Sequence, residues 1–283
     1  MAADLSRFAR RLVPARPDLA AAHLEGSVGA ARFVAGTPMA VAIELLDLTI
    51  TPDRGASLAT QLLLGEAFTV YETRADGLAW GQSGRDGYVG HVEAAALGAP
   101  LGETQRITAL WSHIYSAPTL KARVMGGLPL GGEVAVAGIE GGFAWIEGGF
   151  VPEQHLAPVT GDHVDHALRF LGTPYLWGGR SARGIDCSGL VQMALAAVGV
   201  DAPRDSDMQA AMVGRLLEAD EPAERGDLVF WDGHVGLMRD ARVLVHANAH
   251  HMAVAEEPFA TAVARIEGAG GGPVTARRRI AAE

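Results

Sequence analysis

Two copies of one pattern of short strands constrain what the first half of this chain can fold into. Each copy holds a Gly-Glu pair, then a strand with a tryptophan, then a Gly-aromatic-Val segment. The tryptophans are Trp80 and Trp145, and the Gly-aromatic-Val segments lie at 87–89 and 149–151. The 36 glycines of the chain favour turn-rich β structure over a helical bundle. The repetition therefore indicates a duplication, and the strand lengths fit two small β-barrels.

The only cysteine, Cys187, lies where the periodicity of the sequence changes. A glycine-rich loop is predicted at 175–186, whereas apolar residues from Leu190 to Val198 recur at helical spacing until Gly199. Cys187 is therefore predicted at a helix N-terminus, where unpaired amides and the helix dipole favour the nucleophilic thiolate. The alternative is a small cysteine buried for packing, which is the commoner role of a lone cysteine.

A later stretch supplies a candidate base. Short apolar runs within 226–247 are separated by two turn signals and predict a β-meander. If the second turn is a three-residue loop, Met238 pairs with Arg242. His234 then lies directly opposite His246, with Cβ atoms roughly 5 Å apart, so that His246 could orient His234. Two histidines on a half-exposed sheet are the alternative, but a nucleophile followed by an oriented base is the order of a papain-like site.

Six motifs of the second half together resemble the NlpC-type cell-wall cysteine peptidases. They are YLWGG at 175–179, DCSGLVQ at 186–192, PRDS at 203–206 with Gln209, RGDLVFW at 225–231, GHVG at 233–236 and VH at 245–246. The resemblance covers about residues 160 to 280. It implies a nucleophile at Cys187, a base at His234 and a third polar residue at His246. It also implies a substrate groove lined by Tyr175, Trp177, Asp186, Ser188 and Ser206.

Both copies of the strand pattern resemble bacterial SH3-like domains, which commonly precede this peptidase type. We therefore predict an α+β chain with an N-terminal arm at 1–35, SH3-like barrels at 36–97 and 98–158, and a papain-like domain with an antiparallel sheet at 159–283. Tyr88 of the first barrel resembles the aromatic residue that closes the groove in related enzymes. A barrel-core position for Tyr88 is an equal alternative.

The resemblance implies a cysteine endopeptidase for the γ-D-glutamyl–diamino acid bond. Its substrates would be peptidoglycan-derived peptides with a free N-terminal L-Ala, as in murein peptide recycling, and Asp186 would bind the free amine. The backbone amide of Cys187 and the hydroxyl of Tyr175 are candidate donors to the oxyanion. The alternatives are a non-catalytic peptide-binding module and an amidase or acyltransferase on the same fold. The choice between diaminopimelate and lysine, and the oligomeric state, stay open.

The charge and composition of the chain argue against several classes of partner and cofactor. The formal net charge of -10 argues against nucleic acid or an anionic membrane as a partner. No apolar run near the N-terminus is typical of a signal peptide or a membrane span, and one cysteine forms no internal disulfide, so we expect a cytoplasmic protein. The run NAHH at 248–251 could join Cys187 around a metal, but the spacing of the ligands is not that of a zinc site. We predict no metal and no cofactor.

Overall fold

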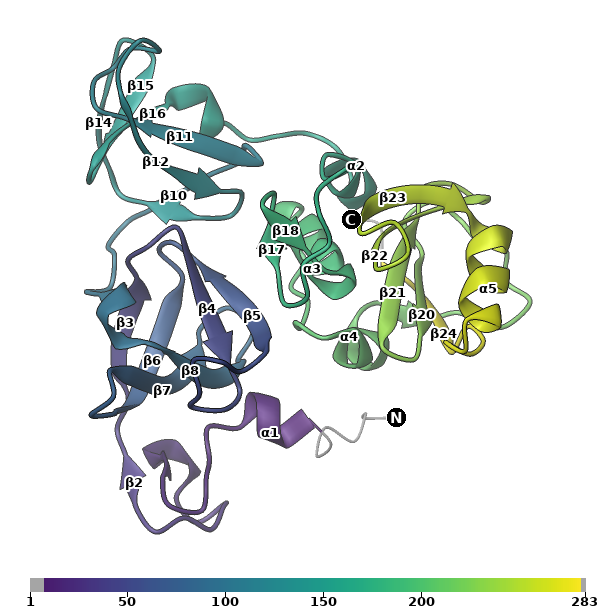
Figure 1. Ribbon diagram of the computed structural model, residues 1–283, viewed down its shortest axis with the longest axis horizontal. Helices are drawn as coiled ribbons and strands as arrows, with labels where there is room; N and C mark the ends of the chain where they lie inside the picture. Colours follow the sequence, from purple (N-terminus) through teal and green to yellow (C-terminus); the bar gives the residue numbers. More distant parts are fainter. Residues whose placement is uncertain (1–7, 281–283) are drawn as a thin grey trace. The chain divides into compact units, whose positions relative to one another are not determined.

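The computed structural model describes residues 8–280 and divides the chain into two compact units. The N-terminal unit ends at Val159, and the C-terminal unit begins at Thr160. Most strands pair antiparallel, and helices are few (Figure 1). The α+β prediction is confirmed, whereas the finer boundaries predicted after residues 35, 97 and 158 stay predictions. Within residues 8–280, no helix has the length and apolar character needed to span a membrane.

The N-terminal unit starts with an arm and a seven-stranded sheet. The arm holds α1 (Ala9–Leu12), β1 (Ala20–Ala21), η2 (Ala22–Leu24) and β2 (Phe33–Val34). The sheet has the order β5-β4-β8-β7-β6-β3-β9 and contains β3 (Thr37–Val41), β4 (Leu45–Thr49), β5 (Leu58–Leu63), β6 (Ala67–Thr73), β7 (Leu78–Ser83), β8 (Val89–Glu93) and β9 (Leu97–Gly98), with η3 (Ala94–Ala96) before β9. A Cβ at Gly81 would lie 2.2 Å from the carbonyl oxygen of Thr69, so only glycine fits where β7 crosses β6.

A second set of strands repeats this topology. It comprises β10 (Gln105–Arg106), β11 (Trp111–Tyr115), β12 (Val124–Pro129), β13 (Glu133–Val134), β14 (Val136–Glu140), β15 (Phe143–Ile146) and β16 (Gly149–Pro152), followed by η4 (Glu153–His155). In both sets a tryptophan strand precedes a last strand, and that last strand returns to pair with the first strand of the initial hairpin. The returning pairs are Thr49 with His91 and Tyr115 with Phe150. The predicted duplication is therefore visible in the strand order.

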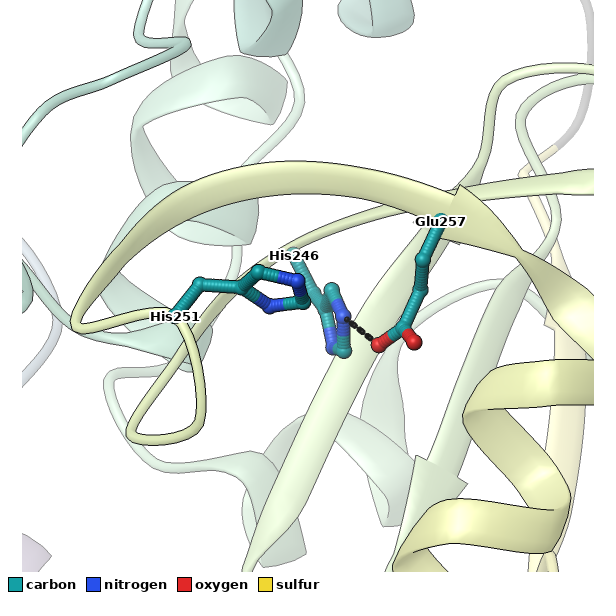
Figure 2. Close-up of side chains that lie close together, drawn as sticks. All are labelled: His246, His251 and Glu257. Carbon is teal, nitrogen blue, oxygen red and sulfur yellow. Dashed lines mark hydrogen bonds and ion pairs between the residues drawn. The ribbon is translucent and has the colours of Figure 1, made fainter.

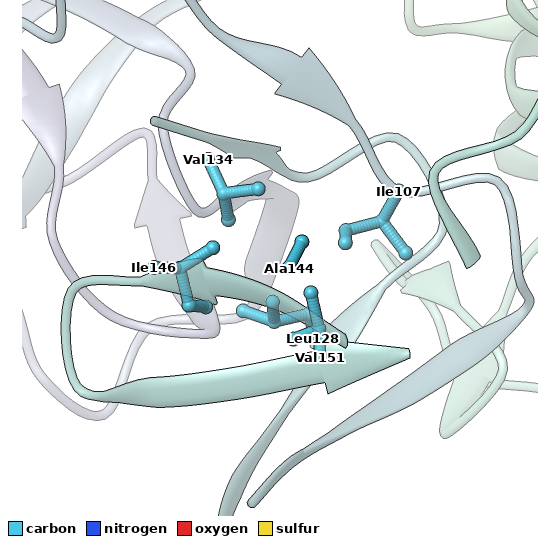
Figure 3. Packing of buried hydrophobic residues seen from close by; sticks show 6 residues of the cluster. All are labelled: Ile107, Leu128, Val134, Ala144, Ile146 and Val151. Carbon is cyan, nitrogen blue, oxygen red and sulfur yellow. The ribbon is translucent and has the colours of Figure 1, made fainter. Parts of the chain in front are cut away.

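The second set of strands encloses a small apolar core of its own. Its fully enclosed side chains converge from β12, β13, β15, β16 and the segment before β11 (Figure 3). They are Ile107, Leu128, Val134, Ala144, Ile146 and Val151. Val134 and Ile146 alternate with more exposed neighbours, which is the period-two pattern of a half-buried strand, whereas Leu128 lies in a continuous buried run.

The C-terminal unit is a six-stranded sheet with helices against it (Figure 1). The sheet order is β19-β24-β20-β21-β22-β23, built from β19 (Arg215–Leu216), β20 (Leu228–Trp231), β21 (His234–Met238), β22 (Val243–Asn248), β23 (Ala253–Pro258) and β24 (Ala276–Arg279). The other elements are α2 (His163–Leu168), β17 (Arg180–Ser181), β18 (Gly184–Ile185), α3 (Cys187–Ala197), α4 (Ser206–Met212) and α5 (Phe259–Gly268). Helix α3 contacts β21 and β22, and α5 packs on Met238 and Leu244.

The β21–β22 hairpin corrects the predicted register. The turn lies one residue later than predicted, because the Asp240 carboxylate accepts the backbone N–H groups of Arg242 and Val243. Met238 consequently pairs with Leu244 and not with Arg242, a shift of two residues. Side chains alternate between faces with a period of two, so a shift of two keeps every side chain on its predicted face.

Candidate active site

Cys187 is the first residue of helix α3, as predicted. Asp186 is the N-cap, and its Oδ1 accepts the backbone N–H of Gly189 at 2.7 Å. A Cβ at Gly189 would lie 2.4 Å from the carbonyl oxygen of Gly179, so glycine is required where the preceding loop crosses the first turn of the helix. The Cys-Ser-Gly sequence thus combines a nucleophile, a capped helix start and a close backbone crossing.

The Asp186 carboxylate is already paired within the unit. Arg204, 1% exposed at its side chain, donates from Nη2 to Asp186 Oδ2 at 2.7 Å and from Nη1 to Oδ1 at 3.0 Å. The backbone N–H of Gly178 also donates to Oδ2, at 2.7 Å. Asp186 therefore also serves as a helix cap and as the partner of a buried arginine, two contacts that the sequence did not reveal. Its contact with substrate stays a prediction.

Burial controls the protonation of Cys187. Desolvation, followed by the nearby Asp186 carboxylate, raises the pKa of the thiol to about 12, although backbone N–H groups of Val235 and Ser188 lower it. Burial also lowers the pKa of His234 to about 3. The thiolate predicted from the helix N-terminus alone is not favoured in the free protein, since burial outweighs the dipole. The hydrogen bond from Val235 places the sulfur beside the residue that follows His234 in β21.

The two predicted histidines meet by a hydrogen bond across the hairpin. His234 Nε2 and His246 Nδ1 lie 2.8 Å apart. The corrected register places the two residues diagonally rather than directly opposite, and imidazoles span this separation while remaining on one face of the sheet. The pKa of His246 is lowered to about 4, chiefly by burial, and its side chain is fully enclosed. His246 is therefore held in one place against the ring of His234.

Sequence reasoning missed Glu257 and Arg265, which continue this contact. His246 Nε2 lies 2.8 Å from Glu257 Oε1, and the Arg265 guanidinium of α5 forms an ion pair with the same carboxylate. Glu257 is 8% exposed. A glutamate in the strand beside the one that carries His246 can reach that histidine diagonally. The sequence could have identified Glu257 in this way only if the register of β23 had been known. The structure supplies that register by pairing Leu244 with Glu257.

Two of these residues, His246 and Glu257, lie close enough to His251 to be considered as metal ligands. The ligand atoms of His246, His251 and Glu257 lie within 4.8 Å of one another, and Figure 2 shows His246 between the other two. Both ring nitrogens of His246 take part in hydrogen bonds, and Arg265 pairs with Glu257. A hydrogen-bonded relay accounts for this arrangement, with His251 held by Asn248 at its margin.

Tyr175 and Ser188, two of the predicted groove residues, lie close to Cys187. Burial, and then the charges of Cys187 and Asp186, raise the pKa of Tyr175, so its phenol stays protonated close to the sulfur. The Ser188 hydroxyl accepts a hydrogen bond from Arg204 at 2.9 Å. Because Tyr175 keeps its proton beside the thiol, its hydroxyl is available as a donor.

The remaining predicted residues differ in exposure. Trp177 is 64% exposed, and Ser206 begins helix α4. Gln209 of α4 donates to the carbonyl oxygen of Ser188 at 2.9 Å, which ties this helix to the nucleophile segment. Tyr88 belongs to the N-terminal unit and is 3% exposed. Its predicted place at the end of the groove stays a prediction.

Comparison with known proteins identifies two families within the chain. Residues 172–264 match the NlpC/P60 family, and residues 48–97 match the bacterial dipeptidyl-peptidase SH3 domain. "Dipeptidyl-peptidase 6" of Lysinibacillus sphaericus is 36% identical over 111 residues, which is 35% of this chain and 41% of that protein. "Gamma-D-glutamyl-L-lysine dipeptidyl-peptidase" of Bacillus subtilis is 35% identical over 105 residues, 34% of this chain and 35% of that protein. The chain thus matches less than half the length of these relatives.

A solved structure extends the likeness of the fold. An NlpC/P60 family protein from Bacillus cereus superposes with a TM-score of 0.69 at 17% identity, covering 86% of this chain and 99% of that one. At this identity the likeness concerns the fold alone. The resemblances seen in the sequence are confirmed for the matched residues. The chain therefore contains an NlpC/P60 domain, which holds Cys187, His234 and His246, preceded by a bacterial dipeptidyl-peptidase SH3 domain.

Proposed function

We propose that the chain is a cysteine peptidase that hydrolyses the γ-D-glutamyl–diamino acid bond of peptidoglycan-derived peptides with a free N-terminal L-Ala. The observation that carries the proposal is the 2.8 Å contact between His234 and His246, beside a cysteine at a helix N-terminus. Two relatives named as dipeptidyl-peptidases, one of them for γ-D-glutamyl-L-lysine, support the bond and the substrate class.

In the proposed reaction one proton moves between two buried groups. His234 accepts the thiol proton as Cys187 Sγ forms a bond to the carbonyl carbon. The imidazolium and the sulfur nucleophile develop their charges together as an ion pair, so neither group carries an isolated buried charge. His234 then gives the proton to the leaving amine as the carbon–nitrogen bond breaks. Water, deprotonated by His234, attacks the thioester and releases the γ-carboxyl group and the thiol. The protonated Tyr175 hydroxyl and the amide of Cys187 are the proposed donors to the oxyanion.

Recognition of a free N-terminus is the finer part of the proposal. The names of the relatives indicate release of a dipeptide. Such release requires the enzyme to bind the N-terminal amine at a fixed distance from the bond that is cleaved. Asp186 is already neutralised by Arg204, so an ammonium would meet a paired carboxylate. Asp186→Asn would disturb that ion pair as well as any amine contact, and discrimination between substrates is the cleaner measurement.

Mass spectrometry of defined tripeptides tests the function. We expect L-Ala-γ-D-Glu-L-Lys or its meso-diaminopimelate analogue to yield L-Ala-D-Glu and the free diamino acid. The kcat/KM of the free peptide should exceed that of the N-acetylated peptide on the order of 100-fold, because acetylation removes a charge and adds bulk. Cys187→Ala is the matched control. Unchanged peptides would favour a binding module, and a product of higher mass would favour a transferase. Equal kcat/KM values for the free and the N-acetylated peptide would refute recognition of the free amine.

The two histidines should differ in their effect on this reaction. We expect His234→Ala to abolish turnover, because it removes the group that carries the proton. His246→Ala should retain measurable activity, since water can replace part of its hydrogen bond to His234. The kcat of each variant on the same tripeptide is the measurement. A lower kcat in the His246 variant than in the His234 variant would reverse the assigned roles.

We also propose murein peptide recycling in the cytoplasm as the setting. The single cysteine and the free-amine substrate support it, because intact wall carries that amine in amide linkage. Fractionation of the native host, with the chain detected by antibody, tests the location. Recovery outside the cytoplasm would redirect the proposal toward wall turnover.

A further inference from the structure

A line of polar side chains crosses the sheet of the C-terminal unit. It runs from His234 on β21 to His246 on β22, then to Glu257 on β23 and Arg265 on α5. Each step between strands is diagonal, because the register pairs Met238 with Leu244 and Leu244 with Glu257. All three side chains therefore share the face on which α5 packs. Around this line the same face is apolar, with Val229, Trp231, Met238 and Leu244 of the sheet packed against Ala262 of α5.

The carboxylate at the end of this line is ionised. Burial alone would raise the pKa of Glu257, but the Arg265 guanidinium and His246 outweigh it and hold that pKa below its usual value. Arg265 is 23% exposed at its side chain, so the positive charge is anchored near solvent while the carboxylate faces inward. Glu257 therefore presents a hydrogen-bond acceptor, and only an acceptor, to His246.

An acceptor at this point dictates every proton position along the line. His246 Nε2 must carry hydrogen to donate to Glu257, which leaves a lone pair on Nδ1. His234 Nε2 must then carry hydrogen to donate to that lone pair. The remaining nitrogen of His234, Nδ1, is left unprotonated. It is the form of the ring that can accept a proton from a thiol.

We propose that Glu257 is a positioning residue that sets the tautomers of His246 and His234 and stabilises the imidazolium formed on His234 during attack. Nothing is bound or oxidised in this role. One proton passes from Cys187 Sγ to His234 Nδ1, and the negative charge of Glu257 faces the resulting positive charge through two hydrogen bonds. The inference rests on the proposed function only for its kinetic test.

The charged groups around the line shift the pKa values of the two histidines in opposite directions. Glu257 raises the pKa values of His234 and His246, and Arg265 lowers both. His251, at the margin, lowers that of His246. The base must be neutral to accept a proton, so activity is lost as the pH falls through the pKa of the histidine pair. Removing the Glu257 charge moves this acid limb to lower pH, and removing the Arg265 charge moves it to higher pH.

Glu257→Gln and Arg265→Gln test the proposal together. We expect Glu257→Gln to lower kcat roughly 10- to 100-fold, because an amide can donate to His246 and reverse the tautomers. Its acid limb should move down. Arg265→Gln should change kcat less than about fivefold and move the acid limb up. A purely structural role would lower activity in both variants and move neither limb, and that result would overturn the proposal.

Glu256→Gln is the matched control. Glu256 precedes Glu257 in β23, faces the other side of the sheet and pairs with Arg239 at 2.8 Å. The substitution makes the same chemical change one residue away from the line. The pH profile should stay that of the unsubstituted protein. A shift as large as that of Glu257→Gln would mean that net charge near the sheet, and not the line, sets the acid limb.

Two readouts remain valid without peptidase activity. Long-range nitrogen–proton spectra of histidine-labelled protein should show His234 and His246 with hydrogen on Nε2 and none on Nδ1. Hydrogen on Nδ1 of His246 in the unsubstituted protein would overturn the proposal even if Glu257→Gln failed to fold. Cys187 is the only cysteine, so its rate of alkylation by iodoacetamide against pH gives the acid limb directly. A normal alkylation profile without peptide cleavage would separate failure of the proposed substrate from failure of this role.

Discussion

Replacing Cys187 with serine is expected to lower kcat/KM on the tripeptide roughly 10³-fold or more. Burial already raises the pKa of the thiol to about 12, and a hydroxyl at the same place ionises less readily than a thiol. The available base is weak, because the pKa of His234 is lowered to about 3. Only a nucleophile as readily ionised and as polarisable as sulfur reacts under these conditions. The measurement is initial-rate kinetics with the released diamino acid quantified.

The same variant should keep its fold. Cys187 is 6% exposed, and exchanging sulfur for oxygen should change the free energy of unfolding by about 1 kcal/mol. Urea unfolding of the two proteins side by side checks this. A serine variant with more than a tenth of the original turnover would make Cys187 a packing residue and end the peptidase proposal.

The sequence predicted the nucleophile segment well because its signals are local. Loop glycines before Cys187 and helical periodicity after it are both read from neighbouring residues, and α3 begins at Cys187 as expected. The contact of the histidines was also predicted, but for a partly wrong reason. The register was two residues off, and the contact survived because an even shift preserves the face of a strand.

The groups that the sequence did not reveal are those held by partners far along the chain. Arg204 reaches Asp186 across 18 residues, and Arg265 reaches Glu257 from a helix that follows the sheet. Charged residues are usually exposed, so nothing in the local sequence marks these as buried. Their roles follow only from which strands and helices are neighbours. The pairing of Asp186 with Arg204 was missed for the same reason, since the sequence shows the anion but not the cation that contacts it.

The pair formed by Asp186 and Arg204 therefore gives the second large expected effect, on stability. Arg204→Leu should lower the free energy of unfolding of the C-terminal unit by about 3 to 5 kcal/mol, because it leaves a buried carboxylate without its counterion. Arg225→Leu is the matched control. Arg225 contacts Asp162 at the same 2.7 Å, but both side chains are exposed, 39% and 44%, and its loss should cost less than about 1 kcal/mol.

Burial, and not distance, separates these two ion pairs, and a double variant tests that reason. Asp186→Asn together with Arg204→Leu removes both charges, while the remaining amide oxygen can still cap Gly189. The double variant should be more stable than Arg204→Leu alone, since no unpaired charge stays buried. Hydrogen exchange of the α3 amides in urea measures the effect in the unit concerned. Equal losses in Arg204→Leu and Arg225→Leu, or a double variant less stable than Arg204→Leu, would show that the helix bearing Cys187 does not depend on this pair.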